Sequence, residues 1–223
     1  RALACALAMQ KGMKDVNARN RNEGLPAVEM GIAVHTGEVV VGNIGSEKRA
    51  KYGAVGSQVN LLARIEALTC GGQVLISERT LQEAGHGIVT GMSLTVRAKG
   101  FPEPLRAHDL LGLVEAPHLH LGQRAEELRP LDPPLKAVFT VLEGKHVARV
   151  EEPAEIVALS ARGAALVTNA SVEVLSDLML RIVGAGGLLP GELYAKVLPS
   201  PGGDLVRLRF TSVPVELESM LSP

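Results

Sequence analysis

The chain has 223 residues, of which 46% are hydrophobic, and its formal net charge is −1. This length and apolar content are sufficient for two ordinary globular domains, each with its own core. Nucleic-acid binding is excluded, because the chain has two tyrosines, three phenylalanines, no tryptophan and no basic run denser than Lys48, Arg49 and Lys51.

The cysteines and the hydropathy pattern indicate a cytoplasmic protein. Cys5 and Cys70 form no spacing motif, which is typical of reduced thiols in the cytosol. No window approaches the roughly 18 uninterrupted apolar residues of a membrane span, so any membrane tether would lie outside this sequence. The helical pattern is already under way at Arg1, and we therefore expect a fragment whose beginning lies upstream.

The first third of the chain predicts a helix followed by two strands. Residues 1 to about 20 carry a helical stripe of Ala2, Ala6, Met9, Met13 and Val16. Residues 28–34 alternate between apolar and other side chains, which predicts a half-buried strand. After a turn at 36–37, the β-branched residues 39–41 predict a short strand bounded by glycines.

The helix predicted after Gly56 carries the residues of greatest interest. Its apolar stripe consists of Leu61, Ile65 and Leu68. Asn60 and Arg64 are four residues apart and therefore project from one face, one turn from each other. Ser57 is a candidate N-cap of this helix.

Beyond that helix the pattern continues to alternate strands with helices. A strand is predicted at 73–76, then a helix that Ser77 caps and that runs to about residue 84, then strands near 93–97 and 105–113. Such interleaving predicts an α/β or α+β domain.

Three sequence blocks together resemble one known family. They are Gly-Ile-Ala-Val-His-Thr-Gly-Glu-Val-Val-Val-Gly at 31–42, Tyr-Gly-Ala-Val-Gly-Ser-Gln-Val-Asn-Leu-Leu-Ala-Arg-Ile-Glu at 52–66 and Gly-Gly-Gln-Val-Leu-Ile-Ser at 71–77. Their order and spacing resemble the second half of the class III nucleotidyl cyclase catalytic domain, the adenylyl and guanylyl cyclases. The resemblance implies an α+β fold, with residues 1–113 forming a partial ferredoxin-like cyclase domain.

The resemblance also implies roles for individual side chains. Cyclising a nucleoside triphosphate needs in-line attack of the 3′-hydroxyl on the α-phosphorus while pyrophosphate leaves. By resemblance, Asn60 would hold the ribose and Arg64 would stabilise the α-phosphate. Taken singly, Asn60 is better interpreted as an ordinary turn or cap residue and Arg64 as a partner in a surface salt bridge, whereas their place in the matching block favours the functional roles. Lys99, with Arg97 beside it, would approach the triphosphate, and a solvated lysine is an equal alternative. Gly53 occupies the base-reading position without a side chain to read the base, and ATP is expected ahead of GTP.

The resemblance further implies Mg²⁺ or Mn²⁺, bound by two aspartates upstream of Arg1, so that this chain alone is expected to be inactive. Family sites lie between two catalytic domains, which implies a homodimer. His35 is interpreted as a turn histidine without a catalytic role.

The second half of the chain predicts a separate small domain. Residues 114–134 contain four prolines and are interpreted as a linker, with His118 and His120 as exposed loop residues and not metal ligands. Residues 135–223 predict seven short strands, which are typical of a small all-β barrel or sandwich.

This half weakly resembles the PilZ family, through Leu-Ser-Ala-Arg-Gly-Ala at 159–164 and Val-Arg-Leu-Arg-Phe-Thr at 206–211. Arg124 and Arg129 have the wrong spacing for the arginine pair that binds cyclic di-GMP, and Ala158 occupies the acidic position. We therefore predict a degenerate PilZ-like domain that does not bind cyclic di-GMP and has a structural or protein-contact role.

Two functions of different classes follow from the sequence. The first is a nucleotidyl cyclase that makes a 3′,5′-cyclic nucleotide and pyrophosphate for intracellular signalling. The second is a noncatalytic cyclase-like module that binds nucleotide or dimerises and signals through its PilZ-like domain. A cyclic di-GMP receptor is a third reading.

Overall fold

The computed structural model describes residues 1–25, 27–46, 48–96, 104–122, 127–143, 146–147, 150–199 and 205–221. The chain divides into two compact units, Arg1–Gln123 and Arg124–Pro223. Within the stretch interpreted as a linker, the structure has a short 3-10 helix, η1 (Pro117–Leu119), and the first residues of strand β7 (Arg129–Glu143). The limits 1–113, 114–134 and 135–223 stay a prediction.

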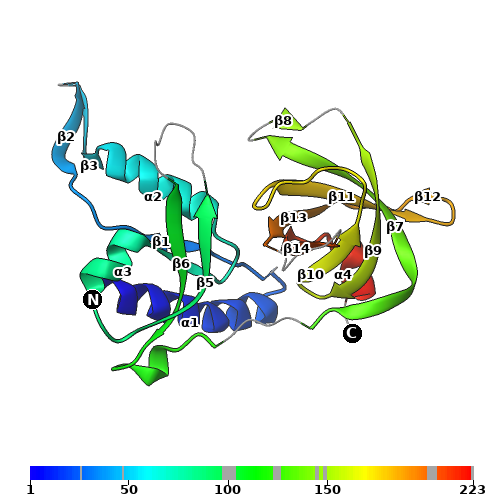
Figure 1. Cartoon of the computed structure of the whole chain (residues 1–223), viewed down its shortest axis with the longest axis horizontal. Helices are drawn as coiled ribbons and strands as arrows, with labels where there is room; N and C mark the ends of the chain where they lie inside the picture. Colours follow the sequence, from blue (N-terminus) through cyan, green and yellow to red (C-terminus); the bar gives the residue numbers. More distant parts are fainter. Residues whose placement is uncertain are drawn as a thin grey trace. The chain divides into compact units, whose positions relative to one another are not determined.

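A four-stranded sheet is the centre of the first unit (Figure 1). In sheet order its strands are β1 (Ile32–Val34), β4 (Val74–Ser77), β6 (Leu105–Leu113) and β5 (Ile88–Val96). β1 and β4 are parallel, and the other two pairings are antiparallel. The helices of this unit are α1 (Ala2–Asn22), α2 (Ser57–Ala67) and α3 (Glu78–Ala84).

Helix α1 packs on this sheet through a face that overlaps only in part with the predicted stripe. Leu3 and Leu7 are buried against Val74, Ile76 and Leu110 of the sheet. Two members of the predicted stripe, Ala2 and Met9, are exposed. Ala6 of the stripe is buried, and Met13 and Val16 are half-buried, so the predicted stripe is confirmed in part. The prediction omitted the two leucines, which lie on one side of the helix.

The strand predicted at 28–34 is shorter in the structure, where only Ile32–Val34 form strand β1. Ahead of it, the carbonyl oxygen of Met30 accepts hydrogen bonds from Gln10 Nε2 at 2.6 Å and from the amide of Gly72 at 2.7 Å. These bonds tie the backbone to α1 and to the approach to β4, so residues 28–30 have no strand partner.

The short strand predicted at 39–41 is longer in the structure and belongs to a separate hairpin. β2 (Val40–Ser46) continues through Gly42 and pairs with β3 (Arg49–Val55) in antiparallel register. The basic residues near the turn, which the sequence placed in a solvated hairpin, are exposed there.

The other predicted elements of this unit are present, with one correction at a cap. Ser77 caps α3 as predicted, because its Oγ accepts a hydrogen bond from the amide of Thr80 at 3.1 Å. Ser57, by contrast, does not cap α2. The N-cap is Gly56, and no side chain accepts a hydrogen bond there.

The second unit is an all-β barrel. Its sheet order is β12-β11-β13-β14-β10-β9-β7-β8, and an additional pairing of β11 with β7 closes a circuit of six strands. The remaining bounds are β8 (His146–Val147), β9 (Glu152–Ser160), β10 (Gly163–Val167), β11 (Asp177–Gly184), β12 (Gly187–Leu188), β13 (Leu193–Leu198), β14 (Leu205–Ser212) and α4 (Val215–Leu221). The predicted fold class, a partial α+β domain followed by a small all-β domain, is confirmed.

The barrel is filled by side chains from alternate positions of its strands, such as Phe139, Leu166, Leu180 and Leu208. Ser160 and Gly163 form the predicted turn, in which the Ser160 hydroxyl accepts a hydrogen bond from the Gly163 amide at 3.0 Å. Arg124 lies outside the described residues. No helix in the described part of the chain is long and apolar enough to cross a membrane.

Candidate functional site

Helix α2 carries the two residues that the sequence singled out. It begins after Gly56, whose φ of 145° is a conformation that favours glycine, and its side chain Ile65 is fully buried. Asn60 is exposed and Arg64 is half-buried, one turn further along the helix. Neither side chain is sealed inside apolar packing, so both are placed where a ligand can reach them. Their roles stay predictions.

An amide and a guanidinium in this arrangement suit a sugar phosphate. The amide both donates and accepts hydrogen bonds, which matches ribose hydroxyls. The planar guanidinium presents several N–H donors in a fixed geometry that matches phosphate oxygens. Two cavities in the described part of this unit, of about 490 and 590 Å³, are lined by other residues.

His35, which the sequence suggested to be a simple turn residue, joins three elements of the unit. Its Nε2 lies 2.7 Å from Gln58 Oε1 in α2, and its Nδ1 lies 2.8 Å from the hydroxyl of Ser77 at the start of α3. Ser77 Oγ is in turn 2.9 Å from Thr80 Oγ1. Sequence reasoning missed this network because its members are separated by 23 and 42 residues, and the Ser77 cap was the one local signal for it.

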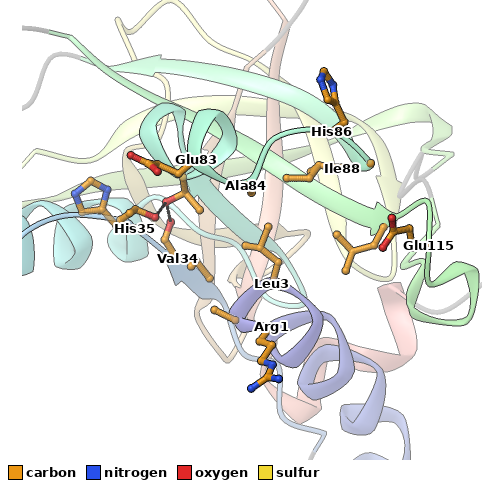
Figure 2. Close-up of a pocket in the computed structure, with 14 residues that line it drawn as sticks. Arg1, Leu3, Val34, His35, Glu83, Ala84, His86, Ile88 and Glu115 are labelled. Atoms are coloured by element: carbon orange, nitrogen blue, oxygen red, sulfur yellow. Dashed lines mark hydrogen bonds between the residues drawn. The ribbon is translucent and has the colours of Figure 1, made fainter.

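Figure 2 shows the 490 Å³ cavity, with His35 at one side and His86 and Glu115 at the other. Its wall is made by the start of α1, the end of β1 and the segment after α3. The dashed lines beside Val34 are bonds of Thr80 Oγ1, which lies 3.3 Å from the Val34 carbonyl oxygen and 3.1 Å from Thr36 Oγ1.

The residues present do not fit a resident divalent metal ion. Among the described residues, no group of three or more His, Cys, Asp and Glu side chains comes together in a way that could hold one. One close pairing of this kind among the described residues is Glu78 Oε2 with His108 Nε2 at 2.8 Å. The other ring nitrogen of His108, Nδ1, forms a hydrogen bond with Ser93 Oγ at 2.8 Å. The hydrogen bonds that Glu78 accepts from His108 and from Gln82 lower the pKa of its carboxyl group.

The other two candidate residues have different outcomes. Lys99 and its neighbour Arg97 lie outside the described residues. Gly53 is half-buried in β3, opposite Gly42 of β2. A Cβ atom at Gly53 would lie 3.6 Å from Ile44 Cδ1, which is ordinary van der Waals contact, so a side chain fits at this position.

Residues 1–100 match the profile of the family described as the adenylate and guanylate cyclase catalytic domain. The first unit is therefore similar to part of a cyclase catalytic domain, and residues 1–100 are called the cyclase segment below. Its similarity extends to solved structures, because the guanylyl cyclase Cya2 is 49% identical, with a TM-score of 0.52 over 55% of this chain and 62% of the Cya2 chain.

A curated relative is similar over about the same part of the chain. Adenylate cyclase 1 of Rhizobium meliloti (strain 1021) is 32% identical over 117 residues, which are 52% of this chain and 18% of that protein. The chain thus spans about a fifth of that relative. For the second unit, the PilZ domain of CeSA from a cellulose-synthesizing bacterium is 17% identical, with a TM-score of 0.31 over 43% of this chain and 91% of that chain.

Proposed function

We propose that the full-length protein is a nucleotidyl cyclase, in which the cyclase segment helps to convert a nucleoside triphosphate to a 3′,5′-cyclic nucleotide and pyrophosphate. The observation that carries the proposal is the pairing of Asn60 and Arg64, one turn apart on a helix seated by the buried Ile65. The match of residues 1–100 to the cyclase family supports it.

The two side chains act on different parts of the reaction. In the step, the ribose 3′-oxygen forms a bond to the α-phosphorus, its proton passes to solvent, and the bond from the α-phosphorus to the pyrophosphate oxygen breaks, so that pyrophosphate leaves. Asn60 holds the ribose so that its hydroxyl is aligned for in-line attack. Arg64 donates hydrogen bonds to the nonbridging oxygens, where negative charge increases in the transition state. Divalent cations supply charge neutralisation in such reactions when bound. Since the described residues do not form a metal site, no step is assigned to a metal ion.

We propose adenine ahead of guanine as the base of the substrate. Both nucleotides are to be assayed. The Rhizobium relative is named an adenylate cyclase, and Cya2 is named a guanylyl cyclase. Gly53, at the position that the family uses to read the base, offers no side chain that favours either.

We further propose that the active form contains a second copy of this chain, packed on the β2–β3 hairpin. The hairpin projects from the start of α2 in Figure 1 and forms a sheet of its own. Val40 and Val55 are opposite each other on one of its faces, and Val41 and Tyr52 lie on the other face. All four side chains are exposed. A two-stranded hairpin that exposes apolar groups on both faces needs a partner to cover them.

The test of the cyclase proposal is the turnover of an Arg64→Ala variant of the full-length protein. Loss of one donor to developing charge is expected to lower kcat by about 10² to 10³, with little effect on folding. Arg79→Ala, which removes an exposed arginine from α3, is the matched control and should leave kcat unchanged. ATP and GTP are each supplied with manganese. A kcat for Arg64→Ala equal to that of the parent would remove Arg64 from the mechanism.

The noncatalytic module is the second candidate, because the exposed hairpin can support association with or without catalysis. It predicts that the full-length protein dimerises and yields no cyclic product from either nucleotide. For the barrel we propose a structural or protein-contact role, and titration calorimetry with cyclic di-GMP should show no binding heat.

A further inference from the structure

Helix α2 has its buried side chain near one end and a polar contact to another element near the other end. The structure describes every residue of α2, and among them only Ile65, near the C-terminal end of the helix, is buried. At the N-terminal end, Gly56 provides no side chain to cap the first turn. In the first turns, which include Asn60, Gln58 provides a side-chain hydrogen bond to a residue outside the helix, in addition to the packing of the half-buried Val59 and Leu61.

Gln58 contacts His35, and His35 is itself held rigidly. The Gln58 Oε1 atom is an acceptor, so the His35 Nε2 atom 2.7 Å away must carry a proton and donate it. In the neutral ring Nδ1 then accepts from the hydroxyl of Ser77, 2.8 Å away. Ser77 and Thr80 are both buried, and the Ser77 hydroxyl also accepts the Thr80 amide. The half-buried imidazole is thus anchored to two buried side chains.

The backbone next to His35 is shaped to the same contact. A Cβ atom at Gly37 would lie 2.6 Å from Gln58 Cγ and 2.9 Å from Gln58 Cβ, a distance that real side chains do not tolerate. The Gln58 side chain therefore passes directly over Gly37 to reach the ring. Glycine at this position is explained by the close approach of α2 and not by the turn alone.

We infer that His35 is a positioning residue, whose hydrogen bond to Gln58 fixes the first turns of α2 and thereby the direction in which Asn60 meets the nucleotide. The inference rests on the proposed cyclase function for its kinetic consequence, whereas the anchoring of α2 does not depend on that function. The rate of in-line attack is sensitive to small displacements of the ribose hydroxyl. Loosening the first turn of α2 therefore lowers kcat and leaves KM nearly unchanged.

Two substitutions of His35 separate its two contacts. In His35→Asn the side-chain amide reaches the place of Nδ1, which keeps the bond to Ser77 and loses the bond to Gln58. In His35→Gln the amide reaches the place of Nε2 and can still donate to Gln58 Oε1. Gln58→Ala removes the same bond from the other side and leaves His35 in place, and Gln82→Ala, which removes an exposed glutamine from α3, is the control.

The first measurement is amide hydrogen exchange of residues 59–62 in the 223-residue chain. We expect exchange about tenfold faster in His35→Asn and in Gln58→Ala, and nearly unchanged in His35→Gln and Gln82→Ala. Thermal unfolding identifies any variant that does not fold, and Gln58→Ala then decides the outcome alone. Unchanged exchange in folded Gln58→Ala would overturn the inference, whatever the protein catalyses.

The second measurement is steady-state kinetics of the same variants in the full-length protein. His35→Asn and Gln58→Ala should each lower kcat by about tenfold to a hundredfold with KM within about twofold, and the double variant should be no slower than the slower single variant. His35→Gln should retain most of the parent kcat. Additive losses, or equal losses in His35→Asn and His35→Gln, would contradict the positioning role. If the parent has no cyclase activity while exchange behaves as expected, the proposed function fails and the anchoring of α2 stands.

Discussion

The proposed dimer is most directly tested by removing the largest exposed apolar side chain of the hairpin, in the variant Tyr52→Ala. The Tyr52 side chain is 77% exposed in the single chain. A buried aromatic side chain removes roughly 150–250 Å² from water, so covering Tyr52 is worth up to about 3 kcal/mol per copy at roughly 25 cal/mol per Å². An isologous interface contains each residue twice, so the effect is doubled.

The dissociation constant of the dimer is therefore expected to rise in Tyr52→Ala, by up to about 10⁴-fold if the side chain is fully covered in both copies. Sedimentation equilibrium over a series of concentrations measures it. Val40→Ala, at a position 70% exposed on the other face of the hairpin, should give a smaller rise in the same direction. Met9→Ala is the control, because Met9 is an apolar side chain of α1 that is 50% exposed and lies outside the hairpin. A parent protein that stays monomeric, or a Tyr52→Ala dimer as tight as the parent, would refute the reasoning.

Two further predictions concern the substrate base and the response to acid. Gly53→Asp introduces a hydrogen-bond acceptor for the exocyclic amino group of adenine, and the same carboxylate repels the carbonyl oxygen of guanine. The ratio of kcat/KM for ATP to kcat/KM for GTP should therefore rise about tenfold. An unchanged ratio would show that position 53 does not contact the base. The pKa of Glu78 lies below its ordinary value of 4.5, chiefly because His108 donates a hydrogen bond to it. Its contribution to stability is therefore present above about pH 4.5 and lost as the pH falls through the lowered pKa, so the melting temperature of Glu78→Gln should fall less steeply in acid than that of the parent. Parallel curves for the two proteins would show that the bond to His108 does not stabilise the fold.

Much of the fold could be predicted from local sequence patterns. The stripe of Leu61, Ile65 and Leu68 placed α2 correctly, and Ser77 marked the start of α3 because an N-cap acts within three residues of itself. The barrel strands were found because each combines a short apolar run with a turn on either side. The two-residue strand β12 and the helix α4 were not predicted, since neither has such a pattern.

Long-range contacts account for what the sequence did not reveal. β2 continues through Gly42 because its partner is β3, and pairing with a neighbour outweighs the weak strand propensity of glycine. The residues that hold His35 are equally distant in sequence, and a histidine beside a turn carries no sign of them. Asn60 and Arg64 could be named as candidates because their spacing is local, whereas the contact that orients the first turn of their helix could not.

The hairpin and the candidate site are coupled by their adjacency. β3 ends at Val55 and α2 begins at Ser57, so a surface that covers the hairpin also approaches the first turn of α2. If a second copy covers the hairpin and completes the site, turnover depends on association. The specific activity of Tyr52→Ala should then be low in dilute solution and rise toward the parent value as the concentration increases. Arg64→Ala should stay slow at every concentration, because it lacks a group that acts on the phosphate. A Tyr52→Ala protein that is dimeric yet inactive would show that Tyr52 acts within the site and does not serve assembly.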